Sequence, residues 1–188
     1  MTEWNSSDVR ARLRELAERD PACERFGAAT HRYALSPAPA EADIGAFEAR
    51  LGVQLPPEYR EFVARVGDGP AGPGHGLLPL AVPRPEATEE DGWAVDDEWA
   101  TDRLPGRAAA RFPLDAPLPG PQPGRRGAAA DELTPGTLVL ADQGCGIYDR
   151  LVLTGRYAGE VWRIDTDWGG FVPLSSGFRE WYVEWLEA

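Results

Sequence analysis

The chain of 188 residues lacks lysine altogether and contains only two cysteines and two histidines. All 19 basic side chains are therefore arginine, a bias that we attribute mainly to codon usage. Cys23 and Cys145 are too few and too far apart for a disulfide framework. Together with only His31 and His75 they argue against a structural zinc site. We therefore expect neither a disulfide-stapled fold nor a metal or other cofactor.

Long apolar runs are also absent. No stretch approaches the roughly 18 apolar residues that a membrane-spanning helix needs, and the N-terminus has no apolar core of the signal-peptide type. We therefore expect a cytoplasmic protein that makes no membrane contacts.

Positive charge is scarce relative to negative charge. The 31 acidic residues outnumber the 19 basic ones, which gives a net charge of −12 and an isoelectric point near 4.6. Such a balance argues against binding to nucleic acid or to anionic membranes, because both attract basic surfaces. It is compatible with a basic protein partner. The apolar share of 43% is enough for a hydrophobic core.

The stretch between residues 137 and 164 has the pattern of consecutive strands. Glycine-bearing turns separate three runs rich in β-branched and aromatic residues, at 137–140, 147–153 and 160–164. Short connections favour antiparallel neighbours, because a parallel crossover needs about a dozen residues or more. We predict that these runs form a three-stranded meander at the centre of the sheet, and that residues 76–80 add a short edge strand.

Helical spacing of apolar residues predicts four helices, at residues 6–19, 41–51, 56–66 and 178–186. The pattern also permits a short helix near 91–100. The last predicted helix carries an aromatic stripe that should pack on the sheet, with a dimer face as the alternative. This stripe consists of Phe178, Trp181, Tyr182, Trp185 and Leu186. Residues 171–174 are apolar but too few to assign.

The linker-like composition near residue 40 suggests a division of the chain. We predict an N-terminal helix-and-linker extension over residues 1–40 and a main domain over residues 41–188. A long acidic, proline- and glycine-rich insert interrupts this domain at about residues 83–136. Its second half, residues 105–136, is rich in Pro, Gly and Ala, and we expect a long loop there.

The first half of the insert is the candidate binding site. Eight acidic residues lie between Glu86 and Asp102, with no basic residue among them. A charge run is usually a solvated loop, but two tryptophans interrupt this one, and aromatic anchors dominate interface energetics. An acidic surface would also steer a basic partner and speed its association. The predicted partner-binding residues are Glu89, Glu90, Asp91, Trp93, Asp96, Asp97, Glu98 and Trp99.

A catalytic interpretation is available for the glycine-rich turn at residues 142–146. Cys145 could serve as a nucleophile with His75 as its base, since a nucleophilic cysteine needs a partner that stabilises its thiolate. The simpler interpretation is a tight turn between strands, where glycines permit positive φ angles. We therefore predict no catalytic residue.

The segment that starts at Asp165 has a weak similarity to a calcium-binding loop. Asp165, Asp167 and Gly169 have suitable spacing, but a third oxygen ligand is missing and Ser176 stands where the bidentate glutamate belongs. A simple turn explains the residues, so we predict no metal site.

Four sequence features occur in a fixed order between about residues 41 and 187. The first is a helix, Gly52, a Leu-Pro pair and an aromatic helix at 47–62, and the second is Gly67-Asp68-Gly69 before the 76–80 strand. The third is the 141–146 turn before Gly155 and Gly159–Trp162. The fourth is Ser176-Gly177-Phe178, which leads into a tryptophan-rich helix. In this order the chain resembles the SUKH superfamily, which includes the yeast cell-wall-synthesis regulators and many bacterial immunity proteins. The long insert and the N-terminal extension depart from the family pattern.

The resemblance implies an α+β fold with a central, mostly antiparallel sheet and helices packed against it. It also implies a non-enzymatic protein-binding module, a monomer or weak dimer. We expect a bacterial immunity protein that binds and neutralises a cognate toxin, which the acidic surface suggests is basic and of the nuclease type. The alternative is a regulatory or scaffolding interaction domain, as in the cell-wall-synthesis regulators.

Overall fold

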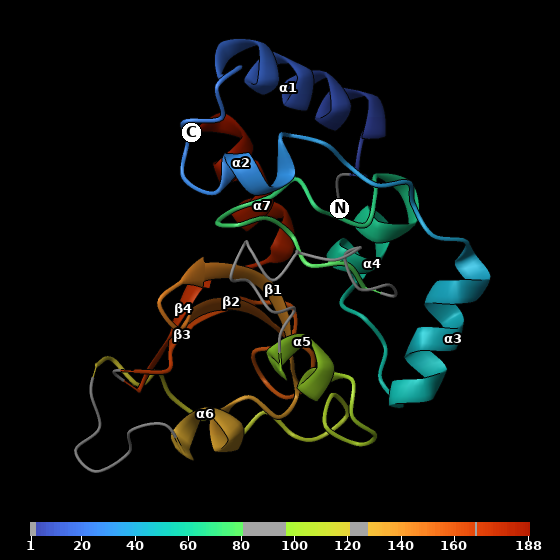
Figure 1. The fold of residues 1–188 in the computed structure, drawn as a ribbon. Coiled ribbons are helices and arrows are strands. Elements are labelled where there is room, and N and C mark those ends of the chain that lie inside the picture. The colour runs from blue at the N-terminus through green and yellow to red at the C-terminus, as the bar shows by residue number, and fades with distance from the viewer. Residues whose placement is uncertain (1–2, 81–96, 121–127, 168) are drawn as a thin grey trace.

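The computed structural model describes residues 3–80, 97–120, 128–167 and 169–188. Within these ranges the chain forms a four-stranded antiparallel sheet and seven helices (Figure 1). The strands are β1 (Thr137–Gly144), β2 (Ile147–Val152), β3 (Val161–Asp165) and β4 (Gly170–Ser175). The helices are α1 (Ser6–Arg19), α2 (Ala28–His31), α3 (Glu41–Leu51), α4 (Pro57–Arg65), α5 (Asp97–Asp102), α6 (Ala128–Leu133) and α7 (Phe178–Glu187). The α+β class that the resemblance implied is confirmed.

The predicted meander is confirmed and has one more strand. The four strands are neighbours in sequence order, and each pairs with the next in antiparallel fashion. Three successive residues of the β1–β2 turn, Gly144, Cys145 and Gly146, have φ angles of 81°, 53° and 74°. Two of the three are glycines because this backbone conformation strains other residues. The apolar residues 171–174, which are too few to assign by pattern, lie in β4.

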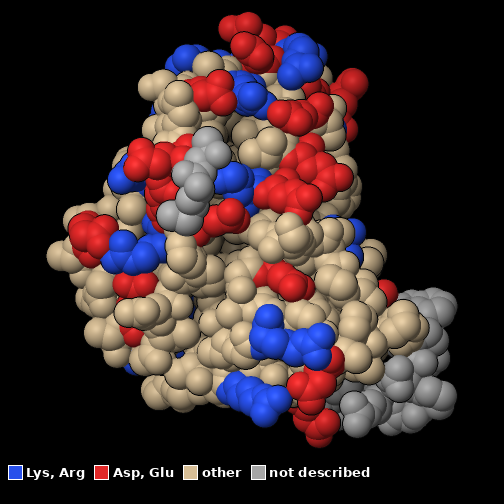
Figure 2. All heavy atoms as spheres, turned by 180° about the vertical axis from the view of Figure 1, so that it is seen from behind, with Lys and Arg blue, Asp and Glu red and all other residues tan. Residues whose placement is uncertain are grey.

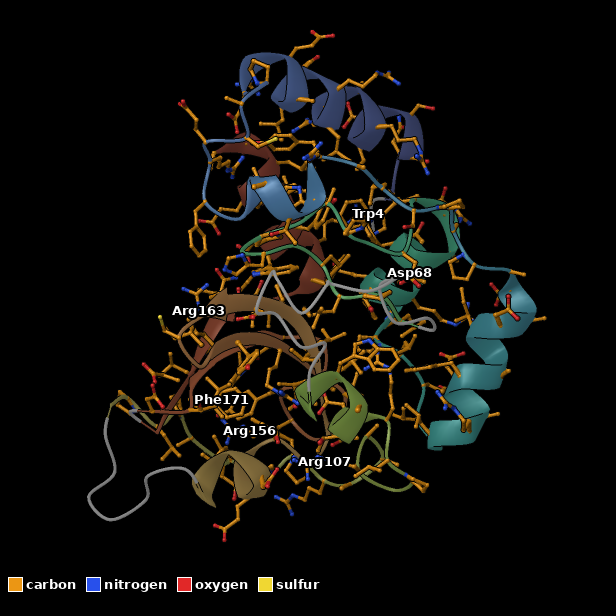
Figure 3. All side chains as sticks on the ribbon, in the orientation of Figure 1. Trp4, Asp68, Arg107, Arg156, Arg163 and Phe171 are labelled. Atoms are coloured by element: carbon orange, nitrogen blue, oxygen red, sulfur yellow. The ribbon has the colours of Figure 1, made fainter. Side chains whose placement is uncertain are left out.

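Hydrophobic cores cover both faces of the sheet. The adjacent residues Val161 and Trp162 are both fully buried, although successive strand residues point to opposite faces. Val161 belongs to the larger core, together with residues of α1, α4 and α7. Trp162 belongs to a smaller core that also contains Phe112, Leu133, Val152, Ile164 and Phe171. Figure 3 shows Phe171 on the side of the sheet that faces α5 and α6.

The insert supplies part of the cover of the second face. Residues 105–120 form turns and irregular chain, in keeping with the predicted long loop, and α6 adds a helix that was not predicted. In the described part of the insert, Phe112 and Leu133 are buried in the smaller core, and residues 128–133 form α6. The Phe112 ring meets Trp162 edge-on, with 5.2 Å between the centroids. This burial could not be predicted, because the apolar residues of the segment have neither helical nor strand periodicity. Their burial is decided by the sheet that they cover.

Both edges of the sheet are also covered. Along β1, the amide groups of His75 and Leu78 donate to the carbonyl oxygens of Asp142 and Leu140, at 2.8 and 2.7 Å. The predicted strand at residues 76–80 is thus an extended segment that forms an isolated bridge with β1.

Along β4, the outer edge is closed by two features. Leu118 exchanges two backbone hydrogen bonds with Phe171, both 2.9 Å long. Two residues further along, Pro173 has no amide hydrogen to offer to another strand. Addition of a partner strand is therefore blocked at both edges over the described residues.

The terminal helix α7 packs on the sheet as its aromatic stripe predicts. All five residues of the predicted stripe are buried. The Phe62 ring of α4 lies 5.1 Å from the ring of Phe178 and 4.6 Å from that of Tyr182. The carboxylate of Glu58 accepts the Arg179 amide at 3.1 Å. Because this bond caps the N-terminus of α7, it ties α7 to α4 at the end where the aromatic rings meet.

Trp4 joins the N-terminal segment to this same core. Its indole N–H donates to the carbonyl of Glu58 at 2.8 Å, and its ring lies 5.0 Å from that of Phe62. Figure 3 shows Trp4 beside α4, and Figure 1 shows α1 lying over α7. The residues before α3 therefore contribute to the core on the first face of the sheet.

We predict that Trp4→Ala lowers the free energy of unfolding by about 3–5 kcal/mol, because a large buried ring leaves a cavity. Urea denaturation at neutral pH measures the change. Trp4→Phe is the matched control, since it keeps an aromatic ring and loses mainly the indole hydrogen bond. Equal stability of Trp4→Ala and wild type would show that this segment does not support the core.

A second prediction concerns pH. Hydrogen bonds from the side chains of Ser176 and Ser175, and from the Ser176 amide, hold the pKa of Glu180 below its ordinary value of 4.5. The folded pKa thus lies below the unfolded one, so the ionised carboxylate stabilises the fold above pH 4.5. This contribution is lost as the pH falls through the folded pKa.

Glu180→Gln should therefore lower stability at pH 7 and flatten the acid side of the stability curve. Urea midpoints measured between pH 3 and pH 7 test this expectation. Glu184→Gln, which changes an exposed residue of the same helix, is the control. Parallel curves for Glu180→Gln and wild type would contradict the prediction.

Candidate partner-binding site

The structure describes only one end of the predicted acidic site. Glu89, Glu90, Asp91, Trp93 and Asp96 lie outside the described residues. Asp97 and Glu98 form the first turn of α5, and the structure describes their backbone only. The helix predicted near residues 91–100 thus corresponds to α5 in its described part. Trp99 is the predicted site residue whose side-chain contacts are described.

The Trp99 side chain packs against the segment that precedes the acidic run. It is half-buried, and its indole N–H donates to the carbonyl of Pro79 at 2.7 Å. The guanidinium carbon of Arg103 lies 3.7 Å from the centroid of the Trp99 ring, which is a close cation–π contact. Trp99 therefore makes structural contacts through its indole N–H and its ring, and only a minor part of the residue remains exposed.

Arg103 binds the same segment through its guanidinium group. It donates to the carbonyl oxygens of Pro79 and Leu80, at 2.8 and 2.9 Å, and to that of Trp99 at 2.8 Å. Burial lowers the pKa of Arg103 to about 10. The side chain stays protonated at neutral pH and supplies charge-assisted hydrogen bonds to these carbonyls. The amide of Leu80 in turn donates to the Asp68 carboxylate at 2.7 Å.

Asp102 ties α5 to the sheet. Its carboxylate is fully buried and forms an ion pair with Arg150 of β2, which is also fully buried. The second carboxylate oxygen accepts the Val139 amide of β1 at 2.7 Å. Arg150 also donates from Nε to Thr137 at 2.8 Å. A buried ion pair needs such additional hydrogen bonds to offset the cost of removing two charges from water.

We call Trp99, Asp102 and Arg103 together the α5 clamp. Through Pro79 and Leu80 the clamp holds the chain where it enters the acidic run, and through α5 it holds the chain where it leaves that run. The segment that ends at Leu80 and the helix that begins at Asp97 are therefore held next to each other and next to the sheet. The clamp has no signal in the sequence, because the partner of Asp102 lies 48 residues away and no local pattern connects the two.

The turn with Cys145 lies at the surface. Cys145 is exposed, and the glycines around it allow the tight β1–β2 connection. The imidazole Nε2 of His75 lies 3.5 Å from the position that a Cβ would take on Gly144. The His75 ring also meets the Phe26 ring edge-on, with 5.1 Å between centroids. The structure thus brings His75 next to the turn, but at an exposed surface shared with an aromatic side chain.

The Asp165 segment forms the β3–β4 turn. Its carboxylate accepts the Asp167 amide at 3.1 Å, as in a turn stabilised by an aspartate side chain. In the part of the chain that the structure describes, no three His, Cys, Asp or Glu side chains come together in a metal-binding arrangement.

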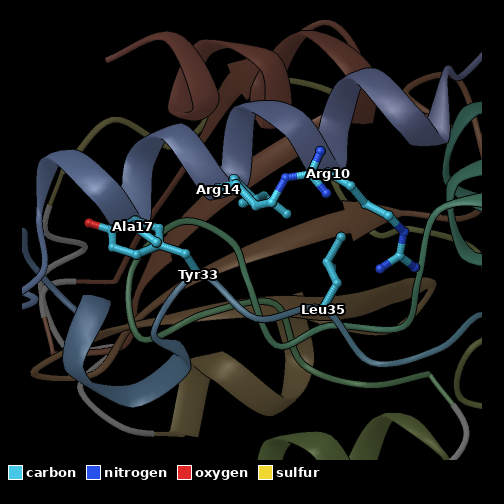
Figure 4. Close-up of a pocket in the computed structure, with 6 residues that line it drawn as sticks. Arg10, Arg14, Ala17, Tyr33 and Leu35 are labelled. Atoms are coloured by element: carbon cyan, nitrogen blue, oxygen red, sulfur yellow. The ribbon is translucent and has the colours of Figure 1, made fainter.

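A shallow groove of about 190 Å³ lies between α1 and the segment at residues 33–35 (Figure 4). Its lining residues are Arg10, Leu13, Arg14, Ala17, Tyr33 and Leu35. Arg10 donates to the carbonyl of Val66 at 2.7 Å, and the Tyr33 hydroxyl donates to Asp20. Burial, with the bond to Asp20, raises the pKa of Tyr33 to about 12. The groove lining therefore offers cations and an apolar floor, and Tyr33 stays a neutral hydrogen-bond donor.

Charge is mixed over the face that is opposite to the view of Figure 1. Figure 2 shows acidic and basic side chains interspersed there, instead of a continuous basic stripe of the kind that binds a phosphate backbone. Of the helices that the structure describes, none combines the length and the apolar character that crossing a bilayer requires.

An α+β domain with a covered sheet and an anchored acidic segment fits the class of protein-interaction domains. The chain belongs to the SMI1 / KNR4 family (SUKH-1), whose model matches residues 38–184. The resemblance to the SUKH superfamily is thereby confirmed. Domains of this family generally bind other proteins and lack enzymatic activity. No curated protein and no solved structure matches the chain.

We predict that Asp102→Ala lowers the free energy of unfolding by about 3–5 kcal/mol, because it leaves the Arg150 charge buried without a partner. Urea denaturation measures the loss. Asp115→Ala is the control, since its ion pair with Arg111 leaves the two side chains 75% and 79% exposed, and exposed pairs contribute little.

Removal of both charges tests the reason for this loss. The double variant Asp102→Leu/Arg150→Met should recover part of the stability, because no uncompensated charge remains. The recovery should be incomplete, since the Val139 amide loses its acceptor. A double variant less stable than Asp102→Ala would contradict this explanation.

Proposed function

We propose that this chain is an immunity protein, a non-enzymatic module that binds a cognate toxin stoichiometrically and thereby neutralises it. The toxin is expected to present a basic surface of the kind that a nuclease uses to hold phosphates. Membership of a family of protein-interaction domains supports the general role. The strong excess of carboxylates supports the choice of a basic partner, since charge complementarity speeds association and excludes wrong partners.

The α5 clamp is the observation that carries the proposal. A long flexible loop loses conformational entropy when it binds, and this loss weakens the complex. The clamp should reduce the loss, because it holds Pro79 and Leu80, which precede the acidic run, and α5, at the end of the run, against each other and the sheet.

The covered sheet edges support the same mode of binding. With the described edges of β1 and β4 both occupied, a partner does not gain affinity by adding a strand. Binding through side chains on loops and turns remains. The residues proposed for this contact are those of the acidic run from Glu89 to Trp99. The proposal treats the protein as a cytoplasmic monomer or weak dimer.

The experiment that tests the function is co-expression with the protein encoded by the adjacent gene in a bacterial host. An immunity protein should restore growth when the neighbour is toxic, and the two purified proteins should form a stable 1:1 complex. A regulatory or scaffolding domain, the alternative that the family also includes, should give no protection. Failure of the two proteins to bind would refute the proposal.

A charge-removal variant tests the acidic run itself. Glu89, Glu90, Asp96 and Asp97 changed together to Ala should slow association with the toxin about tenfold or more at low salt, because electrostatic steering is lost. The variant should also make association less sensitive to salt. Stopped-flow or biolayer interferometry at several salt concentrations measures both effects.

The matched control removes the same number of charges elsewhere. Glu15, Glu18, Glu132 and Glu184 are exposed, and their joint change to Ala should alter the association rate much less. Equal effects of the two quadruple variants would mean that only net charge matters, and would remove the acidic run from the proposed interface.

A further inference from the structure

Phe26 is the most exposed large apolar side chain among the described residues, with 60% of its surface accessible. It lies in the loop before α2, and its ring rests edge-on against the ring of His75. An aromatic ring left in water forgoes the stabilisation of burial. The contacts of the neighbouring residues show whether Phe26 lies in a loosely held loop or on a surface that the fold holds in place.

The residues before Phe26 are tied down. The Asp20 carboxylate accepts the amides of Glu24 and Arg25, at 2.7 and 3.1 Å. The guanidinium of Arg25 donates to the carbonyl of Trp185 in α7 at 2.6 Å, and it lies over the Trp185 ring. The loop is thus fastened to the terminal helix one residue before the exposed ring.

The residue after Phe26 is fixed by contact between backbones. A Cβ on Gly27, which has a φ of 74°, would lie 1.7 Å from the carbonyl oxygen of Gly74. A Cβ on Gly74 would lie 2.4 Å from the carbonyl oxygen of Asp142 in β1. The His75 amide also donates to that Asp142 carbonyl at 2.8 Å. Three chain segments therefore stack without side chains between them, and the position of Phe26 follows from that of the sheet.

The surface continues from Phe26 to the turns at one end of the sheet. His75 lies beside Gly144, as described above, and Cys145 is exposed next to it. In the β3–β4 turn, the Thr166 hydroxyl donates to the carbonyl of Gly146 at 3.0 Å. Figure 1 shows the loop before α2 and the β1–β2 turn on the same side of the molecule.

Two carboxylates accompany these residues at the surface. Glu24 and Asp167 are exposed at its two ends. Two of the nearby arginines are paired within the chain: Arg25 donates to the carbonyl of Trp185, and Arg163 donates to the buried carboxylate of Asp149 at 2.7 Å. We define the Phe26 surface as Glu24, Phe26, His75, Cys145 and Asp167.

We propose that the Phe26 surface is a second contact area for the cognate protein partner, with Phe26 as an anchor that enters an apolar pocket rimmed by basic side chains. This inference rests on the proposed function and names a surface for it. Aromatic residues at the centre of an interface carry much of the binding energy. A ring held in place by the fold loses little conformational freedom on binding.

The Phe26 surface and the α5 clamp lie within reach of one partner. His75 and Leu80 begin and end the extended segment beside β1, so they are separated by about 17 Å at 3.3 Å per residue. A typical interface buries about 800 Å² on each protein, a patch roughly 30 Å across. One partner can therefore contact both areas at once.

Binding of wild type, Phe26→Ala and Leu104→Ala to the purified, catalytically inactivated product of the adjacent gene tests the proposal. Phe26→Ala should weaken the dissociation constant about 30-fold or more, as expected for a hot-spot residue. Leu104 is 55% exposed and lies outside the Phe26 surface, so Leu104→Ala should change the constant less than about threefold. Unchanged melting temperatures should show that both variants fold.

Chemical modification gives a second test that does not alter Phe26. In a Cys23→Ser background, attachment of a polyethylene glycol maleimide to the exposed Cys145 should block binding. In the same background Cys145→Gly, which suits the positive φ of 53° at this position, removes the thiol, so its binding should be the same before and after treatment with the reagent. Full binding after modification would overturn the proposal.

The outcomes separate the inference from the function on which it rests. If wild type binds and Phe26→Ala binds equally well, the Phe26 surface is refuted and the immunity function stands. If wild type does not bind the adjacent protein, both are refuted. If sedimentation shows a wild-type dimer that Phe26→Ala abolishes, a second copy of the chain occupies the surface, and the proposal of a heterologous partner is wrong.

Discussion

The buried ion pair between Asp102 and Arg150 is the interaction on which the second half of the structure depends. It joins the short helix α5 to the middle of the sheet, at a place where neither charge reaches water. Lone charges at such a depth would be strongly destabilising, so each requires the other. The pair thereby fixes how the insert returns to the sheet, and it positions the chain that goes on to cover the second face with Phe112 and Leu133.

Because the sheet is covered, the proposed contacts with a partner lie on the loops and turns around it. Cores lie on both faces, Leu77 and Leu118 form bridges along the two outer strands, and Pro173 withholds an amide. What remains accessible is a set of loops and turns fastened to a rigid centre. In many proteins a rigid scaffold provides the stability and the loops on it bind the partner. The α5 clamp beside the acidic run and the exposed Phe26 ring beside the closely packed Gly27 and Gly74 are two examples.

Local patterns predicted a large share of the fold. The aromatic stripe of α7 and the apolar spacing of α1, α3 and α4 have the helical period, and the boundaries agree within about two residues, the uncertainty of any boundary assignment. The strands around the glycine-rich turns were equally clear. The structure of the insert could not be predicted, because its buried residues follow no period. Helix α2 could not be predicted either, because it is a single turn with too few residues for a pattern. Of the candidate site, composition indicated the acidic run, but it could not indicate the clamp or Phe26.

The sequence by itself determined the element types, the antiparallel order of the central strands, the family and the acidic character, because these depend on local spacing, turn length and composition. Only the tertiary structure decided which charges are buried together, which apolar residues stay in water and which segments close the sheet. Arg150 and Phe26 illustrate the reason. An arginine within a strand and a phenylalanine before a glycine have no local signature of burial or exposure, since both properties are set by residues distant in sequence: Asp102 for the arginine, and Gly74 and Trp185 for the loop that carries the phenylalanine.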